Sequence, residues 1–204
     1  MSKNTAKNNP KKISKKEQRR QQIAKEKRDK NLKIIIPLVL VVAVIGGFLL
    51  WRSVQPEVEG TTVIPSAPGN QHDAELTFAG GGLPPMGGAH NPTWLNCGIY
   101  DDEVPAQNAI HSLEHGAIWV TYDPAQVDDN QVANLRDLVR GNNQTILSPY
   151  PNQDAPIVLT AWDRQLVLDN DGDARFEEFM NRYRGKRGPE AGSACAQGVG
   201  DPIG

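Results

Sequence analysis

The chain has 204 residues, which leaves room for about one domain and a short anchor and excludes a large multidomain protein. Its formal net charge of −2 hides a sharp segregation of charge. Residues 1–33 hold 13 Lys and Arg and 3 Asp and Glu, a net of +10, while residues 34–204 hold 9 basic and 21 acidic residues, a net of −12. A single globular domain rarely divides its charge at one point, so we expect the two regions to be separated physically.

The separating segment is an uncharged apolar run at residues 34–51, IIIPLVLVVAVIGGFLLW. As a helix it would rise about 27 Å, close to the roughly 30 Å of a bilayer core. Trp51 stands where an aromatic residue of the membrane interface is expected. A cleaved signal peptide is the alternative, but its apolar region usually has about 7–15 residues, and no clear A-x-A cleavage site follows. The sequence therefore predicts a basic tail at 1–33 and a transmembrane helix at 34–51.

The basic residues near this span almost all precede it. The positive-inside rule then predicts a single-pass protein of the cell membrane with a cytoplasmic N-terminus and a C-terminal domain outside. The membrane is thus an expected partner, and the tail could contact anionic lipid. No nucleic acid is expected, because the tail has no aromatic residue on which a base could stack.

Residues 52–74 mix Pro, Gly, Ser, Thr and Glu without an apolar period and predict a linker. The extracytoplasmic domain follows at 75–204. It opens with a Gly- and Pro-rich loop, continues with a short helical turn at 110–115, and then with a strand at 117–122. Asp123 and Pro124 indicate the start of a helix that ends at Gly141.

A brief extended piece is expected at 146–147, and residues 157–162 and 166–168 predict a pair of strands. The last helix carries four apolar residues on one face, namely Phe176, Phe179, Met180 and Tyr183. The fold class is therefore α+β, a small sheet with two packed helices, preceded by one transmembrane helix.

Both cysteines of the chain, Cys97 and Cys195, fall in the outer domain. Disulfides persist in oxidising compartments, so we predict that these two cysteines form one. Two free thiols are the alternative.

The motif His111-Ser-Leu-Glu-His115 places two histidines at i and i+4 on one helix face, close enough to share a metal ion. The loop before it carries Met86 and His90. Imidazole suits copper or zinc and a thioether suits copper, so we predict a metal site of His90, His111, His115 and Met86, holding copper or zinc. Glu114 is a possible base or further ligand. His72 lies in the predicted linker and is left out of this site.

Two alternatives stay open. His111 and His115 could instead hold the Gly- and Pro-rich loop by hydrogen bonds, in a structural or interaction module of the cell envelope. The spelling H-x-x-E-H is also that of some zinc metallopeptidases, in which Glu114 would be the general base and Glu190 a third ligand. We expect binding rather than catalysis and assign no catalytic residue, since five residues are a short signature and Gly116 ends the helix at once.

Several stretches together resemble a family of bacterial membrane-anchored proteins, domain of unknown function number 3105. They are LPPMGGAHNPT from Leu83, HSLEHGAIWVTYDP from His111, LSPYP from Leu147 and LTAWDR from Leu159. The family often has Ser-Gly-Pro-His where this chain has Gly-Gly-Ala-His at 87–90. The resemblance implies attachment to a membrane and supplies no activity.

Overall fold

The computed structural model describes residues 15–53, 56–65, 69 and 71–203. By the contacts within the chain these fall into two compact units, Met1–Pro56 and Glu57–Gly204. The first 14 residues of the predicted basic tail lie outside the described residues.

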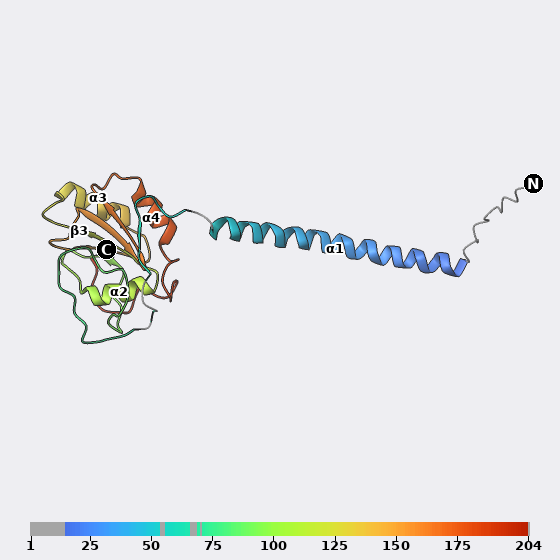
Figure 1. Cartoon of the computed structure of the whole chain (residues 1–204), viewed down its shortest axis with the longest axis horizontal. Coiled ribbons are helices and arrows are strands. Elements are labelled where there is room, and N and C mark those ends of the chain that lie inside the picture. Colours follow the sequence, from blue (N-terminus) through green and yellow to red (C-terminus); the bar gives the residue numbers. More distant parts are fainter. Residues whose placement is uncertain (1–14, 54–55, 66–68, 70, 204) are drawn as a thin grey trace, which may run out of the picture. The chain divides into compact units, whose positions relative to one another are not determined.

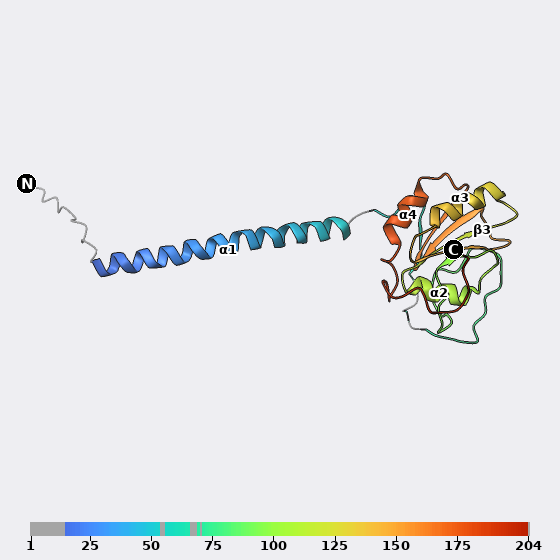
Figure 2. The same cartoon turned by 180° about the vertical axis from the view of Figure 1, so that it is seen from behind.

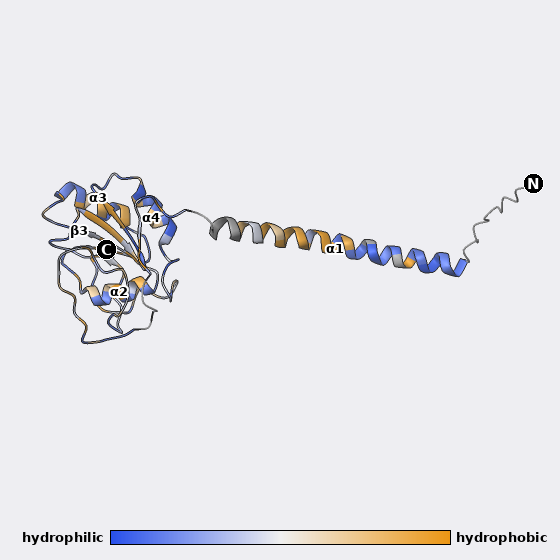
Figure 3. Ribbon diagram, in the orientation of Figure 1, coloured by the Kyte–Doolittle hydropathy of each residue, from blue (hydrophilic) through white to orange (hydrophobic). Residues whose placement is uncertain are grey.

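The first unit contains a single helix, α1 (Lys15–Ser53). It is the one helix in the described part of the chain that is long and apolar enough to cross a membrane. Figure 3 shows the change along α1 from a hydrophilic N-terminal half to a hydrophobic stretch. The predicted span at 34–51 lies within α1, although the side chain of Trp51 lies outside the described residues.

The second unit is built on a six-stranded mixed sheet in the order β1-β6-β5-β3-β4-β2. The neighbouring strands β3 and β4, and β4 and β2, run parallel, and the other pairs are antiparallel. The strands are β1 (Thr62–Val63), β2 (Gly98–Ile99), β3 (Ile118–Tyr122), β4 (Thr145–Pro149), β5 (Ile157–Ala161) and β6 (Arg164–Leu168). The helices are α2 (Ala106–Glu114), α3 (Asp129–Val139) and α4 (Arg175–Tyr183). This architecture confirms the predicted α+β class, with one more helix than predicted because the expected short turn is the nine-residue α2.

The sheet separates two apolar clusters, and the alternation of side chains along β3 shows why. Ile118 and Val120 pack into the cluster that contains residues of α3 and α4, whereas Trp119 packs into the cluster that contains residues of α2. Figures 1 and 2 show the same arrangement, with α3 and α4 over one face of the sheet and α2 over the other. The candidate site lies on the α2 side.

The start of α3 differs from the sequence prediction. Asp123 does not begin a helix but holds a turn, in which its Oδ1 accepts from the Ala125 N–H. The N-cap of α3 is Asp128, which exchanges hydrogen bonds with Gln131 in a capping box. A turn is therefore inserted between β3 and α3. The helix is capped by Asp128 and not by Asp123.

The predicted linker at 52–74 is also partly structured. Val58 is buried in the apolar core, and β1 pairs with β6. The carboxylate of Glu57 accepts a hydrogen bond from Tyr183 of α4 and pairs with Arg164 at 3.0 Å. The domain thus begins near Glu57, because these contacts tie the preceding segment to the sheet.

The predicted disulfide between Cys97 and Cys195 is present, with Cα atoms 5.3 Å apart and a sequence separation of 98. It joins the segment before β2 to the C-terminal segment. Backbone hydrogen bonds run alongside it, from Cys97 N–H to the Cys195 carbonyl at 2.8 Å and from Asn96 N–H to the Val199 carbonyl at 2.8 Å. The bridge therefore fastens the end of the chain to the domain.

Replacing both cysteines, as Cys97→Ser with Cys195→Ser, should lower the free energy of unfolding by about 2–5 kcal/mol, because the unfolded chain gains the freedom of a long open loop. Thermal or denaturant unfolding of the purified protein measures the loss. Two thiols that react with an alkylating reagent in the native, exported protein would contradict the bridge.

Candidate metal centre

Helix α2 carries the centre, and its C-terminal end is fixed by a glycine. Gly116 has a φ of +97°, which favours glycine, and its N–H donates to the Leu113 carbonyl at 2.9 Å. A Cβ there would lie 3.2 Å from the Gly185 Cα and 3.3 Å from the Ala191 Cα. The last turn of α2 therefore ends tightly against the C-terminal part of the domain.

The Gly- and Pro-rich loop is held on α2 by polar side chains of the helix. Ser112 Oγ donates to the Leu95 carbonyl at 2.7 Å and accepts from the Leu95 N–H at 3.0 Å. Asn108 Nδ2 donates to the Thr93 carbonyl at 2.6 Å. These bonds give the loop a defined path across α2, and this path brings His90 beside the last turn of the helix.

In three histidines, a backbone carbonyl determines which ring nitrogen carries the proton. The Nδ1 atom lies 2.7 Å from the Gly88 carbonyl in His90, 2.8 Å from the Asn91 carbonyl in His111, and 2.7 Å from the Ala194 carbonyl in His115. A carbonyl oxygen can only accept a hydrogen bond, so each Nδ1 carries the proton. The Nε2 atom of a neutral ring then keeps its lone pair, which is the form in which histidine binds a metal ion.

Four side chains converge at this point, those of His72, His90, His111 and Glu114. Each offers one ligand atom, and these atoms all lie within 4.8 Å of one another. The rings are packed closely, since His72 stacks on His111 at 5.0 Å between ring centroids and meets His90 edge-on at 4.9 Å. Ligands of one tetrahedral zinc ion lie roughly 3.3 Å apart when the bonds are about 2.0–2.1 Å long. A shift of about an ångström would thus bring the four atoms onto one ion.

The electrostatics of the group centre on Glu114. Its side chain is fully buried in the last turn of α2, where the helix dipole is negative and disfavours a carboxylate. Glu114 Oε2 lies 2.9 Å from the Nε2 atom of the equally buried His90, and 3.8 Å from His72 Nε2. Because Nδ1 of His90 holds that ring's proton, the neutral ring presents a lone pair to a carboxylate oxygen. The contact therefore requires a cation between these atoms, either a proton or a metal ion.

The pKa of His111 is shifted in the direction that suits a ligand. Burial lowers this pKa, the hydrogen bond to the Asn91 carbonyl partly offsets the shift, and the neighbouring histidines lower it further. A lowered pKa keeps the ring neutral at neutral pH. Protons therefore compete only weakly for its Nε2.

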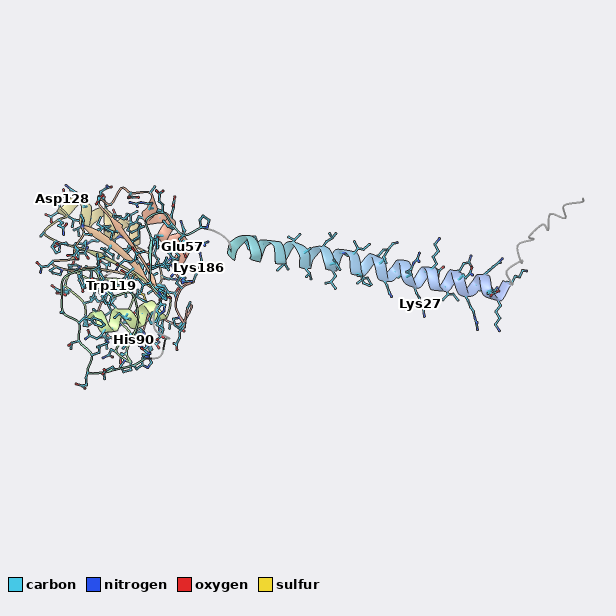
Figure 4. The ribbon with its side chains drawn as sticks, in the orientation of Figure 1. Lys27, Glu57, His90, Trp119, Asp128 and Lys186 are labelled. Carbon is cyan, nitrogen blue, oxygen red and sulfur yellow. A yellow bond between two sulfur atoms is a disulfide. The ribbon has the colours of Figure 1, made fainter. Side chains whose placement is uncertain are left out.

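The structure brings together His90, His111 and Glu114 of the residues predicted from the sequence, and it adds His72. The omission of His72 has a clear reason, since it stands in the segment predicted as linker. The one signal for it in the sequence is that all four histidines of the chain follow the apolar run at 34–51. Figure 4 labels His90 beside α2.

His115 lies next to the cluster but outside it. Its ring is 4.7 Å from that of His111, and its Nε2 lies 3.5 Å from the carboxylate of Glu190. Met86 is tied to the β5–β6 turn through its carbonyl, which accepts from the Asp163 N–H at 3.0 Å. A ligand role for the Met86 sulfur stays a prediction.

The change Glu114→Gln tests whether a cation is required here. The amide of glutamine can donate to His90 Nε2, and it removes a buried charge from the negative end of α2. Replacing buried ionic groups is often neutral or stabilising. We expect the metal-free variant to be as stable as the wild type or more stable, by up to about 2 kcal/mol, in thermal unfolding with a chelator present.

Glu190→Gln is the matched control, since Glu190 also faces a histidine but is 40% exposed. This variant should change the stability by less than about 0.5 kcal/mol. A loss of more than about 2 kcal/mol in Glu114→Gln would show that the carboxylate charge itself holds the fold.

Of the three comparisons with known proteins, one gives a match. Neither the comparison with curated proteins nor that with solved structures gives a match. A family model described as "Protein of unknown function (DUF3105)" matches residues 73–197, which include His90, His111 and Glu114 and begin one residue after His72. The match covers more than half of the chain, and the protein therefore belongs to this family.

Proposed function

We propose that the outer domain binds one transition metal ion, copper or zinc, through His72, His90, His111 and Glu114. The observation that carries this proposal is the contact of 2.9 Å between His90 Nε2 and Glu114 Oε2, both fully buried. A metal ion that binds both atoms satisfies the carboxylate charge and the lone pair of the ring together. The other two imidazoles stand where they can complete a set of four ligands.

The chemistry of the ligands narrows the choice of ion. Three imidazole nitrogens and one carboxylate oxygen suit a divalent ion such as Zn²⁺ or Cu²⁺, whereas soft sulfur ligands favour Cu⁺. Copper(II) binds such sites most tightly in general, while zinc accepts a tetrahedral set without distortion. Both metals therefore belong in the experiment.

A zinc peptidase is supported less well. That chemistry uses three protein ligands, an open position for water, and a glutamate that acts as base rather than ligand. In this domain Glu114 points its carboxylate at two of the histidines, and His115 lies outside the cluster. Four ligands of protein origin are typical of a closed site, which fits sensing, storage or delivery of the metal.

A module of the cell envelope without metal is the second candidate. The hydrogen bonds from His111 and His115 to the carbonyls of Asn91 and Ala194 favour it, because they show that both rings help to hold the fold. This role uses Nδ1 alone and does not account for the arrangement of the four ligand atoms.

We place this domain outside the cell, anchored by α1. The charge of residues 1–33 supports this orientation through the positive-inside rule, and a disulfide suits an oxidising compartment. A metal site on that side would meet metal ions before they enter the cell.

Metal content tests the main proposal. Protein purified after growth in medium with added copper or zinc should carry about one metal ion per chain, measured by mass spectrometry of the elements.

His111→Asn keeps a donor for the Asn91 carbonyl and removes the ligand nitrogen, so it should lose the metal and keep the fold. Glu114→Gln should lose at least tenfold in affinity, which is on the order of what loss of one ligand costs.

His115→Asn is the control, since it makes the same chemical change on a ring that lies beside the cluster. It should retain the metal. Wild-type protein that contains no copper or zinc after growth in either medium, and that takes up neither on addition, would favour the module without metal.

Orientation has its own test. A reporter that is active only outside the cytoplasm, fused after Gly204, should be active, and the same reporter fused before Met1 should be silent. The reason is the basic charge that precedes the apolar span. The opposite pattern of activity would place the disulfide and the histidines in the cytoplasm and rule out an extracytoplasmic site.

A further inference from the structure

One of the four side chains of the metal centre differs from the others in where it comes from. His90, His111 and Glu114 are buried and belong to α2 or to the loop held on it. His72 is 37% exposed and belongs to the segment between β1 and the Gly- and Pro-rich loop. We call residues 71–73 the strap.

The strap is held on the domain by little besides His72. Its backbone makes two hydrogen bonds with His90, from His90 N–H to the Gln71 carbonyl at 3.0 Å and from Asp73 N–H to the His90 carbonyl at 2.8 Å. All three residues of the strap are exposed, and none is a large apolar residue. Hydrogen bonds of this kind contribute only about 0.5–1.5 kcal/mol each.

The chain just before the strap passes directly over the buried carboxylate. A Cβ on Gly69 would lie 2.1 Å from Glu114 Oε1 and 2.6 Å from the Pro189 Cγ. A side chain at this position would require the chain at residue 69, the Glu114 carboxylate or Pro189 to shift. A glycine at residue 69 therefore lets the backbone lie close against the Glu114 carboxylate.

We infer that the strap is the metal-dependent part of the domain, so that occupancy of the centre controls whether residues 71–73 are docked against the loop at His90. This inference rests on the proposed function. With the metal bound, His72 ligates it and adds a strong link to two weak hydrogen bonds. Without it, the strap keeps those bonds and the ring contacts of His72 with His90 and His111, and it opens more often. Coupling is reciprocal, so docking of the strap raises metal affinity by the factor by which the metal favours docking.

The test uses the full chain in detergent micelles, with ZnCl2 as the probe. Hydrogen exchange of the backbone amides of Asp73 and His90, followed by mass spectrometry, reports the opening of the strap. Zinc should slow their exchange in the wild type by roughly 5–150-fold, the usual range of coupling between sites. In His72→Gln zinc should no longer slow it, and the affinity for zinc should fall by a similar factor.

Two further variants separate the causes. Gln71→Ala is the matched control, since it removes an exposed side chain of the strap and keeps the imidazole, so it should behave as the wild type. Gly69→Ala keeps all four ligands but displaces the chain before the strap, so it should weaken zinc binding and abolish the protection. If His72→Gln is less stable than the wild type without metal, Gly69→Ala replaces it as the test variant.

The possible failures are distinct. If the wild type binds zinc but exchange at Asp73 and His90 does not change, or if His72→Gln binds zinc as tightly as the wild type, the strap inference is wrong and His72 is not a ligand, while the proposed metal site stands on His90, His111 and Glu114. If the wild type binds no zinc, the proposed function fails for this metal, and the strap inference fails with it.

Discussion

The arrangement of the Glu57–Gly204 unit around its candidate metal centre depends on one buried contact, that between the carboxylate of Glu114 and the Nε2 atom of His90. A carboxylate without exposure, at the negative end of a helix and against a ring lone pair, carries a large electrostatic cost unless a cation is shared. The segments around this contact are nevertheless held firmly in place. Gly116 ends the helix there, and the C-terminal segment is closed by a disulfide. A rigid surrounding structure that holds an electrostatically unfavourable pair in place is typical of a ligand-binding site.

His111 shows why the motif could not be assigned from the sequence. The sequence left a structural role and a ligand role as alternatives for this residue. The ring has two nitrogens, however, and each can serve one of these two roles. Nδ1 donates to the Asn91 carbonyl and holds the loop, and this bond leaves Nε2 with its lone pair toward the cluster. A structural hydrogen bond thus prepares the ligand. Loss of stability in a His111 variant is therefore no argument against metal binding, and the asparagine replacement is needed to separate the two.

The elements that sequence reasoning found are those with a local signal. The apolar run at 117–122 became β3, the pair at 157–168 became β5 and β6, and the spacing of Phe176 and Phe179 marked α4. The two-residue strands β1 and β2 have no such pattern, because their place is set by the strand beside them. The first turn of α2 was missed for a related reason, since Ala106-Gln-Asn is neither apolar nor capped by a side chain. His72 reaches the cluster through a contact between segments that are distant in the sequence, and no spacing rule detects such a contact.

The distribution of exposure over the four ligands bears on what the centre can do. A hydrolytic metal site keeps one position open for water and a substrate, and it needs a cavity around that position. Here three of the four side chains are buried, and the fourth, His72, is the one in contact with solvent. A metal ion that enters or leaves by the solvent side would meet His72 first. The position that a hydrolase would leave to substrate is therefore filled by a residue of the chain itself. In the proposed metal site, this arrangement favours exchange of the ion with the surroundings over turnover of a substrate.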